Sequence, residues 1–415
     1  MHTIHKDAHT MITNIIAANM PGKAVQDALQ AHTFTKNLYI IAIGKAAWTM
    51  AQAAASYLDG SYRRGIIVTK YDHAKGPLPR FDIYESGHPV SDENTITATQ
   101  KCIELAQALT KDDELLFLVS GGGSALFEKP LDGISLDDIQ ETTNQLLASG
   151  ADIVEMNMVR KRFSAVKAGR FAKLCEPANV YAVILSDVLG DRLDSIASGP
   201  AVPDMSTVAD AVKVVDKYGL NLTHMQQKYL LDETPKEISN VKTVITGSVR
   251  TLCAAAAKTA KELGYTPVVL TTTMNCEAAE AGRMMASIAA DTAVGASSFT
   301  KPCAIIAGGE TVVNLKGSGK GGRNQELALS AARGIDGLHD TLVFSLGSDG
   351  TDGPTDAAGG IVDGQTMSKL KAKGIDVDTV LANNDSYHCL AQVDGLIITG
   401  PTGTNVNDVT VILCK

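Results

Sequence analysis

The sequence predicts an α/β fold of two domains, each built on a mainly parallel sheet covered by helices. Short apolar runs rich in β-branched residues alternate with longer, Ala-rich amphipathic stretches along the whole chain. This alternation is typical of parallel strands joined by crossover helices. The length of 415 residues corresponds to roughly two to three domains. Right-handed crossovers would then align the loops that follow the strands along one edge of each sheet.

The predicted elements can be followed in chain order. The run NLYIIAI at 37–43 is a buried strand, and 45–58 is the helix after it. A second helix is predicted over 95–109, where apolar residues recur at helical spacing. The other predicted strands lie at 65–69, 114–119, 180–185, 243–246, 267–270, 303–307 and 342–346. Because 232–240 is polar and contains a proline, we expect domains at 1–236 and 237–415.

Composition excludes several classes of protein. The chain has 37 Lys and Arg against 46 Asp and Glu, a net charge of −9, so it is a poor candidate for binding nucleic acid. No apolar run approaches the ~18 residues that cross a bilayer, and the start of the chain lacks the pattern of a signal peptide. Seven scattered cysteines form no zinc pattern. We expect a cytoplasmic protein without membrane or nucleic-acid partners.

Glycine is the unusual residue, with 37 copies where roughly 7% of the chain, about 29, would be typical. Many follow a predicted strand, and the clearest case comes after 114–119. Its members are Ser120, Gly121, Gly122, Gly123 and Ser124. Consecutive glycines let backbone N–H groups converge on a phosphate; the alternative is a flexible turn. Lys45 opens a helix, where a positive charge is unfavourable unless an anion is bound there; the alternative is a solvated lysine.

A second glycine-rich region follows the strand at 303–307. Glu310 comes first, and GSGKGG at 317–322 then leads into Arg323 and Asn324. The spacing fits the G-x-G-x-x-G dinucleotide pattern, but the acid that this pattern requires is misplaced, and the Walker A pattern fails. We interpret the segment as a hinge that delivers Arg323 to a phosphate or carboxylate. The alternative is an exposed first turn of a helix.

Acidic residues also follow strands. Asp349, Asp352 and Asp356, interleaved with glycine, could surround a cation such as Mg²⁺, or form a solvated turn. Asp187 and Asp191 follow 180–185, where ligands bind in open parallel sheets. Asp187 could hold a metal or accept a proton, and Asp191 could do the same or cap a turn.

The histidine with the most suggestive context is His88, in SGHPV. It could contact an anion or transfer a proton, or simply be a satisfied loop histidine. Together, glycine loops, two cations and several carboxylates favour phosphoryl transfer, which needs positioning and charge neutralisation.

The loops, in this order, resemble the glycerate 2-kinase family with a C-terminal MOFRL domain. The resembling motifs span nearly the whole chain and include GKAAW (44–48), SGHPVSDENT (86–95), LVSGGGSALFE (118–128), NMVRKRFSAVKAGR (157–170), LSDVLGDRLDSIASGPAVPD (185–204), GGETVVNLKGSGKGGRNQELALSAA (308–332), GSDGTDGPTDAAGGIVDG (347–364) and ITGPTGTNVNDV (398–409).

The resemblance implies phosphorylation of D-glycerate at its 2-hydroxyl by ATP and Mg²⁺. It also implies a Rossmann-like N-terminal domain, a MOFRL-type C-terminal domain and an active site in the cleft between them. Lys45 and Arg323 are implied as central, with Asp187 as a further candidate. The glycine loop of 120–124, His88, Asn324 and Glu310 are the candidates for binding substrate or phosphate. The candidate metal ligands are Asp187, Asp191, Asp349 and Asp352.

Two other functions stay open. Relatives of this family have been named hydroxypyruvate reductases, and the G-x-G-x-x-G match at 317–322 is compatible with a nicotinamide-dependent oxidoreductase. A regulator that binds sugar acids is the alternative that is not an enzyme. A homodimer is also left open.

Overall fold

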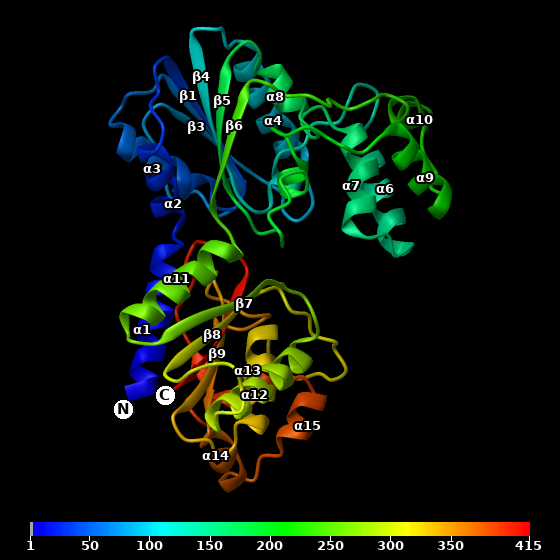
Figure 1. The fold of residues 1–415 in the computed structure, drawn as a ribbon. Coiled ribbons are helices and arrows are strands. Elements are labelled where there is room, and N and C mark those ends of the chain that lie inside the picture. Colours follow the sequence, from blue (N-terminus) through cyan, green and yellow to red (C-terminus); the bar gives the residue numbers. More distant parts are fainter. Residues whose placement is uncertain (1–2) are drawn as a thin grey trace. The chain divides into compact units, whose positions relative to one another are not determined.

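The computed structural model describes residues 3–415, which separate into two compact units. One unit is the continuous segment Pro21–Thr246, and the other combines the residues up to Met20 with Gly247–Lys415. We call them the parallel-sheet unit and the mixed-sheet unit. Both contain sheets with helices, so the predicted α/β class is confirmed (Figure 1). Among the residues described, no helix is long and apolar enough to span a membrane.

The parallel-sheet unit contains six strands in the order β3-β2-β1-β4-β5-β6. This is the order of a Rossmann-like sheet. The strands are β1 (Asn37–Ile43), β2 (Arg64–Lys70), β3 (Phe81–Ser86), β4 (Asp113–Val119), β5 (Asn179–Leu185) and β6 (Val241–Gly247). The predicted strand at 37–43 has the predicted bounds, whereas β3 was not predicted because its residues are only half-buried.

Helices cover both faces of this sheet because side chains alternate along buried strands. Ile41 and Ile43 of β1 pack on one face, and Ile40 and Ala42 pack on the other. The covering helices are α2 (Pro21–Gln30), α3 (Ala47–Leu58), α4 (Glu93–Gln107) and α8 (Arg170–Leu174). The short helix α5 (Gly123–Leu126) follows β4 directly.

Four further helices form a separate group beside the sheet, with an apolar core of their own (Figure 1). They are α6 (Leu136–Ala148), α7 (Ile153–Arg160), α9 (Val208–Tyr218) and α10 (His224–Leu230), and two short 3₁₀ turns lie at Lys161–Phe163 and Ile196–Ser198. The start of α7 is fixed by Asp152, whose carboxylate accepts hydrogen bonds from the N–H groups of Val154 and Glu155 at 2.8 and 2.9 Å. This group was not predicted as a separate body.

The mixed-sheet unit has the strand order β11-β10-β9-β12-β8-β7. Here β7 and β8 pair in parallel, whereas β12 is antiparallel to both β8 and β9. The strands are β7 (Thr266–Met274), β8 (Cys303–Gly309), β9 (Thr341–Gly347), β10 (Gly359–Asp363), β11 (Leu396–Ile397) and β12 (Asp408–Cys414). The helices are α1 (Thr3–Ala18), α11 (Val249–Glu262), α12 (Ala278–Ala293), α13 (Arg323–Gly334), α14 (Thr366–Ala372), α15 (Val377–Ala382) and α16 (Ser386–Ala391).

The two units differ from the expected division at 236/237 in two respects. Strand β6 completes the parallel sheet, so the change of unit falls at Thr246/Gly247. Helix α1 belongs to the mixed-sheet unit, where it lies beside α11 (Figure 1). The physical reason is the apolar face of α1, on which Ala8, Met11 and Ile15 are fully buried.

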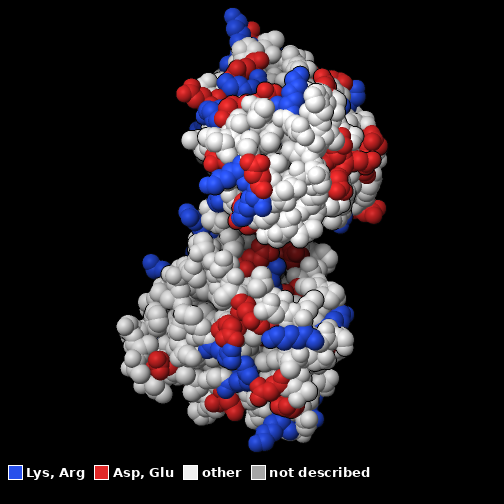
Figure 2. Space-filling view, turned by 90° about the vertical axis from the view of Figure 1, so that its right-hand side faces the viewer, with Lys and Arg blue, Asp and Glu red and all other residues white. Residues whose placement is uncertain are grey.

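Figure 2 shows Lys and Arg side chains interspersed with Asp and Glu over the visible face of the protein. No extended basic tract is visible on that face of the described chain. This distribution is consistent with the negative net charge and does not favour a nucleic-acid surface.

Candidate active site

The first group of candidate residues gathers where β1 and β4 end. These strands are parallel neighbours, with Ile43 opposite Val119, so their following loops leave the sheet at the same edge. The loops are joined there, because Ser120 N donates to Ile43 O at 3.0 Å and Lys45 N donates to Gly121 O at 2.9 Å. In this strand order the connections run in opposite directions from β1 and β4, which is where ligands bind in open α/β sheets.

Ser120 has a structural role in this arrangement. Its hydroxyl accepts a hydrogen bond from Ala46 N at 3.0 Å and donates one to Ile43 O at 3.2 Å. The side chain is buried. The hydroxyl therefore holds the two loops together, and the phosphate-binding capacity of this segment rests on the glycines that follow.

The glycines of this loop allow three charged or polar side chains to approach the backbone. A methyl group at Gly121 would clash with the carboxylate of Asp187. At Gly122, which has φ +83°, a methyl group would lie 3.0 Å from His88 Nε2 and 3.1 Å from Lys45 Cγ. The structure thus brings together Lys45, His88 and Asp187 around the glycine loop; of these, Lys45 and Asp187 were predicted to follow strands, whereas the strand before His88 was not predicted.

The imidazole of His88 is neutral at physiological pH. Partial burial, together with the charges of Lys45, Lys70 and His73, lowers its pKa to about 4. A neutral imidazole beside a lysine can donate or accept one hydrogen bond without adding positive charge. His88 is therefore suited to contact a ligand through hydrogen bonding.

The outer end of the loop is tied to a distant segment. The hydroxyls of Ser124 and Ser198 lie 2.9 Å apart, and Ser198 Oγ donates to Asn157 Oδ1 at 3.4 Å.

Asp191 lies on the connection after β5, in a turn where its φ is +54°. Its N–H donates to Val188 O at 3.0 Å.

The second group of candidate residues lies in the mixed-sheet unit and is centred on Arg323, the first residue of α13. Its guanidinium donates to both carboxylate oxygens of Asp408, from Nε at 2.6 Å and from Nη2 at 3.1 Å. Nη1 donates to Glu310 Oε1 at 2.9 Å. Asn407 Nδ2 donates to the second oxygen of Glu310 at 3.4 Å. The three bonds from Arg323 to Asp408 and Glu310 use three of the five N–H donors that an arginine carries.

Burial sets the electrostatics of this pair. It raises the pKa of Asp408 to about 6, while the hydrogen bonds and charge of Arg323 oppose the shift. Burial also acts against the charge of Arg323, but Asp408 and Glu310 outweigh it and hold the pKa of the guanidinium above its usual value. The bidentate geometry favours the charged pair.

Asp352 was predicted as a metal ligand. In the structure its carboxylate accepts hydrogen bonds from backbone N–H groups at the start of α13. One oxygen accepts from Asn324 N at 3.2 Å, and the other accepts from Gln325 N at 2.9 Å. The side chain is buried, and burial raises its pKa. Asp352 therefore satisfies the free N–H groups at the start of α13, which the interpretation as a metal ligand did not foresee.

The other predicted residues of this unit have local partners. Asn324 Oδ1 accepts from Ser345 Oγ at 2.6 Å inside the core, which leaves its role structural in this arrangement. Asp349 Oδ1 accepts from Thr351 N at 3.0 Å, as in a side-chain-closed turn. Asp356 Oδ1 accepts from Tyr387 OH at 2.7 Å.

The glycine-rich segment before Arg323 is packed tightly against 383–386. A side chain at Gly317, Gly319 or Gly321 would clash with residues of that segment. Backbone bonds complete the packing, including Gly319 N to Asn383 O at 2.9 Å. These glycines permit a close approach between two loops, so the G-x-G-x-x-G match has a packing explanation.

The described part of the chain offers no ready-made cluster of metal ligands. Within residues 3–415, no three His, Cys, Asp or Glu side chains group closely enough to hold an ion.

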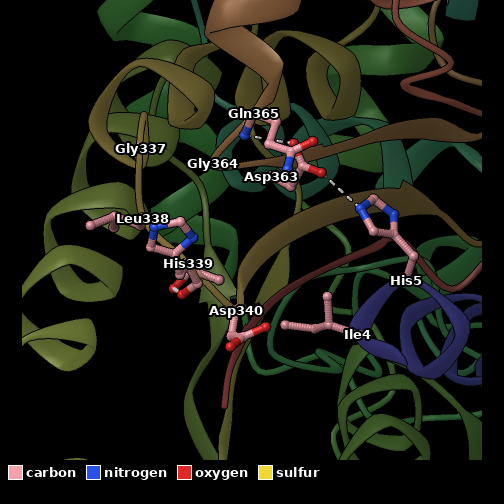
Figure 3. A pocket seen from close by; sticks show the side chains of 10 residues that line it. Ile4, His5, Gly337, Leu338, His339, Asp340, Asp363, Gly364 and Gln365 are labelled. Carbon is pink, nitrogen blue, oxygen red and sulfur yellow. Dashed lines mark hydrogen bonds and ion pairs between the residues drawn. The ribbon is translucent and has the colours of Figure 1, made fainter. Parts of the chain in front are cut away.

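A cavity of about 410 Å³ in the mixed-sheet unit lies away from the predicted residues. There His5 of α1 points to Asp363 across the cavity, with 2.8 Å between Nε2 and Oδ2 (Figure 3). This contact anchors α1.

Several residues of these groups were missed by sequence reasoning. Asp408, the main partner of Arg323, begins β12, 85 positions away along the chain. Arg160, Lys161 and Lys167 are buried or half-buried cations. The last three stand in one motif, NMVRKRFSAVKAGR, and the density of basic residues in it was a usable signal. Asp408 stands in another of the resembling motifs, ITGPTGTNVNDV (398–409), but no role was predicted for it.

Comparisons with known proteins agree with this architecture. Residues 7–231 match the model of a domain of unknown function, DUF4147, and residues 303–408 match the MOFRL family. The D-glycerate 2-kinase of Thermotoga maritima is 52% identical over 99% of this chain and 98% of its own length. The glycerate 2-kinase of Pyrococcus horikoshii is 44% identical over 91% of this chain and 87% of its own. Relatives from Agrobacterium vitis, 39% identical, have names that include hydroxypyruvate reductase.

A solved structure makes the same connection. The crystal structure of glycerate kinase from Thermotoga maritima superimposes with a TM-score of 0.98 at 51% identity and covers 100% of both chains. The likeness in sequence and in structure thus extends over essentially the entire length. This chain belongs to the glycerate 2-kinase family that combines a DUF4147 domain with a MOFRL domain.

Proposed function

We propose that this protein phosphorylates D-glycerate at its 2-hydroxyl with ATP, giving 2-phosphoglycerate and ADP. The observation that carries the proposal is the full-length relationship, at 52% identity, to a protein named D-glycerate 2-kinase. The loops after β1 and β4 support it independently, because they combine a glycine-rich segment with the ammonium of Lys45. Such a combination suits the phosphates of a nucleotide.

In this proposal the residues around the glycine loop bind and orient the reacting groups. The N–H groups of Gly121–Ser124 and the ammonium of Lys45 stabilise the charge on the transferred phosphoryl group. Neutral His88 hydrogen-bonds to a substrate oxygen. Asp187, whose carboxylate lies against Gly121, accepts the proton of the 2-hydroxyl or carries the metal.

Mg²⁺ is part of the proposal as the companion of ATP. Mg²⁺ usually keeps several waters and is bound by one or two carboxylates together with the substrate phosphates. The absence of a three-residue cluster among residues 3–415 is compatible with that mode. Asp187 is the preferred ligand, with Asp191 and Asp349 as further candidates, and Asp352 is left out because it caps α13. When bound, Mg²⁺ would neutralise phosphate charge.

Arg323 and Glu310, in the mixed-sheet unit, are further candidates for binding phosphate in this proposal. Two N–H donors of Arg323 are not used in its bonds to Asp408 and Glu310. With one third of its side chain exposed, the guanidinium can offer those donors to a phosphate. Asp408 holds the plane of the guanidinium in place.

Reduction of hydroxypyruvate is the alternative. It has weaker support, since the glycines of 317–322 that match the dinucleotide pattern are packed against 383–386. The two relatives named as glycerate 2-kinases, 52% and 44% identical, are also more similar to this chain than those named hydroxypyruvate reductase, at 39%.

One pair of assays separates the two functions. D-glycerate and ATP are supplied with enolase as the coupling enzyme, which consumes 2-phosphoglycerate directly. Hydroxypyruvate and NADH are supplied in parallel. ATP-dependent product without added phosphoglycerate mutase is the expected result. A product that needs the mutase would contradict the 2-hydroxyl assignment, and turnover with NADH alone would overturn the kinase proposal. The homodimer stays a prediction, which light scattering tests.

A further inference from the structure

Arg160, the last residue of α7, is a half-buried arginine whose guanidinium makes no hydrogen bond to any residue that the structure describes. Its Nε atom is buried and unpaired, and no acceptor within residues 3–415 lies in hydrogen-bonding distance of its guanidinium. Burial lowers its pKa. Neighbouring arginines behave differently: Arg162 donates to Asp232 O at 2.7 Å, and Arg170 donates to Lys161 O at 2.6 Å.

The charges around Arg160 do not balance. The carboxylate that acts on it is Glu128, which forms a buried ion pair with Lys167. One oxygen of Glu128 is itself buried without a partner. Glu128 is the carboxylate that acts on both Arg160 and Lys167, so these two cations share one negative charge. An unpaired buried charge is costly, so this shared carboxylate indicates a place that an anion fills during function.

Hydrogen bonds connect the helix that carries Arg160 to the glycine loop. Asn157 lies three residues before Arg160 on α7, and residues three apart share one face of a helix. Asn157 Oδ1 accepts from Ser198 Oγ, whose oxygen lies 2.9 Å from that of Ser124, the last residue of the loop. Glu128 follows Ser124 by four residues. The helix face that carries Arg160 is therefore the one joined to the loop.

We propose that Arg160 binds the carboxylate of the hydroxy-acid substrate and so selects acids over neutral polyols. This inference rests on the proposed function and names the residue that recognises the acceptor. A planar guanidinium forms two parallel hydrogen bonds with a carboxylate. The glycine loop and Lys45 offer donors for phosphate. Arg160 offers a separate cation, on the face of α7 that is joined to this loop.

The test compares a charged substrate with a neutral analogue. Steady-state rates are measured for wild type, Arg160→Met and Arg160→Lys with D-glycerate and with glyceramide, in which an amide replaces the carboxylate. We expect kcat/KM for D-glycerate to fall by about 100-fold or more in Arg160→Met, with partial retention in Arg160→Lys. The preference for D-glycerate over glyceramide should collapse, and KM for ATP should change by less than about threefold.

A second measurement does not depend on turnover. D-glycerate alone should raise the melting temperature of wild type and leave that of Arg160→Met unchanged, since a ligand stabilises only the protein that binds it. Arg64→Met is the matched control, because Arg64 is exposed at the start of β2 and pairs there with Asp82. Its kinetic constants and thermal shift should equal those of wild type.

The outcomes separate the two proposals. If wild type fails to phosphorylate D-glycerate but its thermal shift depends on Arg160, the proposed function fails and the carboxylate site stands. A rise in KM for ATP with the acid preference intact would assign Arg160 to the nucleotide and overturn the inference. Equal losses with D-glycerate and glyceramide, or a thermal shift that Arg160→Met retains, would show a structural role and overturn it as well.

Discussion

Replacing Arg323 by methionine should destabilise the protein as well as inactivate it. The variant leaves Asp408, which is 4% exposed, with neither of the two hydrogen bonds from the guanidinium. Removing one partner of a buried ion pair costs about 3–5 kcal/mol. We expect the lower end, about 3 kcal/mol, because a carboxyl whose pKa is already raised to about 6 can take up a proton.

The size of the effect makes it measurable by calorimetry. One kcal/mol corresponds to roughly 2–4 °C in units of about 150–250 residues, so the melting temperature should fall by roughly 6–12 °C. The loss should be smaller at pH 5 than at pH 8, since protonated Asp408 needs no counter-charge. The double variant Arg323→Met/Asp408→Asn should recover part of the loss, because a neutral amide replaces the stranded carboxylate.

Two results would refute this reasoning. A melting temperature within about 2 °C of wild type would mean that the ion pair contributes little to the free energy of unfolding. A double variant no more stable than the single one would mean that Asp408 is not the group left uncompensated. Arg323→Lys keeps the charge but not the bidentate geometry, so its stability should lie between the two.

The remaining predictions concern the glycine loop. Lys45→Ala should lower kcat by about 100-fold, the scale of one lost electrostatic stabiliser, with the melting temperature unchanged; wild-type turnover would contradict its role. Gly121→Ala should lower kcat/KM by about 10-fold or more by displacing the carboxylate of Asp187, whereas Gly22→Ala, whose methyl meets only Ala53 at van der Waals distance, should be silent. Because the pKa of His88 is lowered to about 4, the unfolded chain binds the extra proton between about pH 4 and 6.5, so stability should rise with pH there. His88→Gln should flatten that rise in thermal melts; an unchanged slope would rule out His88 as its source.

Local patterns in the sequence were sufficient for the central strands of the parallel-sheet unit, but not for β3 or for the separate helix group. Buried strands such as β1 and β4 are continuous apolar runs, and the loops after them carry Lys45 and the glycines of 121–123. Parallel neighbours align their carboxyl ends, so residues that follow strands in the sequence meet in space. This is why Lys45 and Asp187 could be predicted to lie close together.

The mixed-sheet unit was harder to predict because its decisive contacts are long-range. Antiparallel pairing places β12 between β8 and β9 and so brings Asp408 to Arg323. The sequence around Asp352 suggested a metal ligand because helix caps and metal sites favour the same acidic residues. The position of α13 shows the capping role of Asp352, which the sequence alone did not indicate.

The position of β12 has a consequence for how the protein is made. The parallel-sheet unit is one continuous segment, Pro21–Thr246, so it can complete its fold early in synthesis. The other unit receives β12, which pairs with both β8 and β9, only after the other five strands of its sheet have been synthesised. Until then β8 and β9 each expose an unpaired edge, which is the form most open to aggregation. Chaperone dependence during translation should therefore concentrate on this half of the protein.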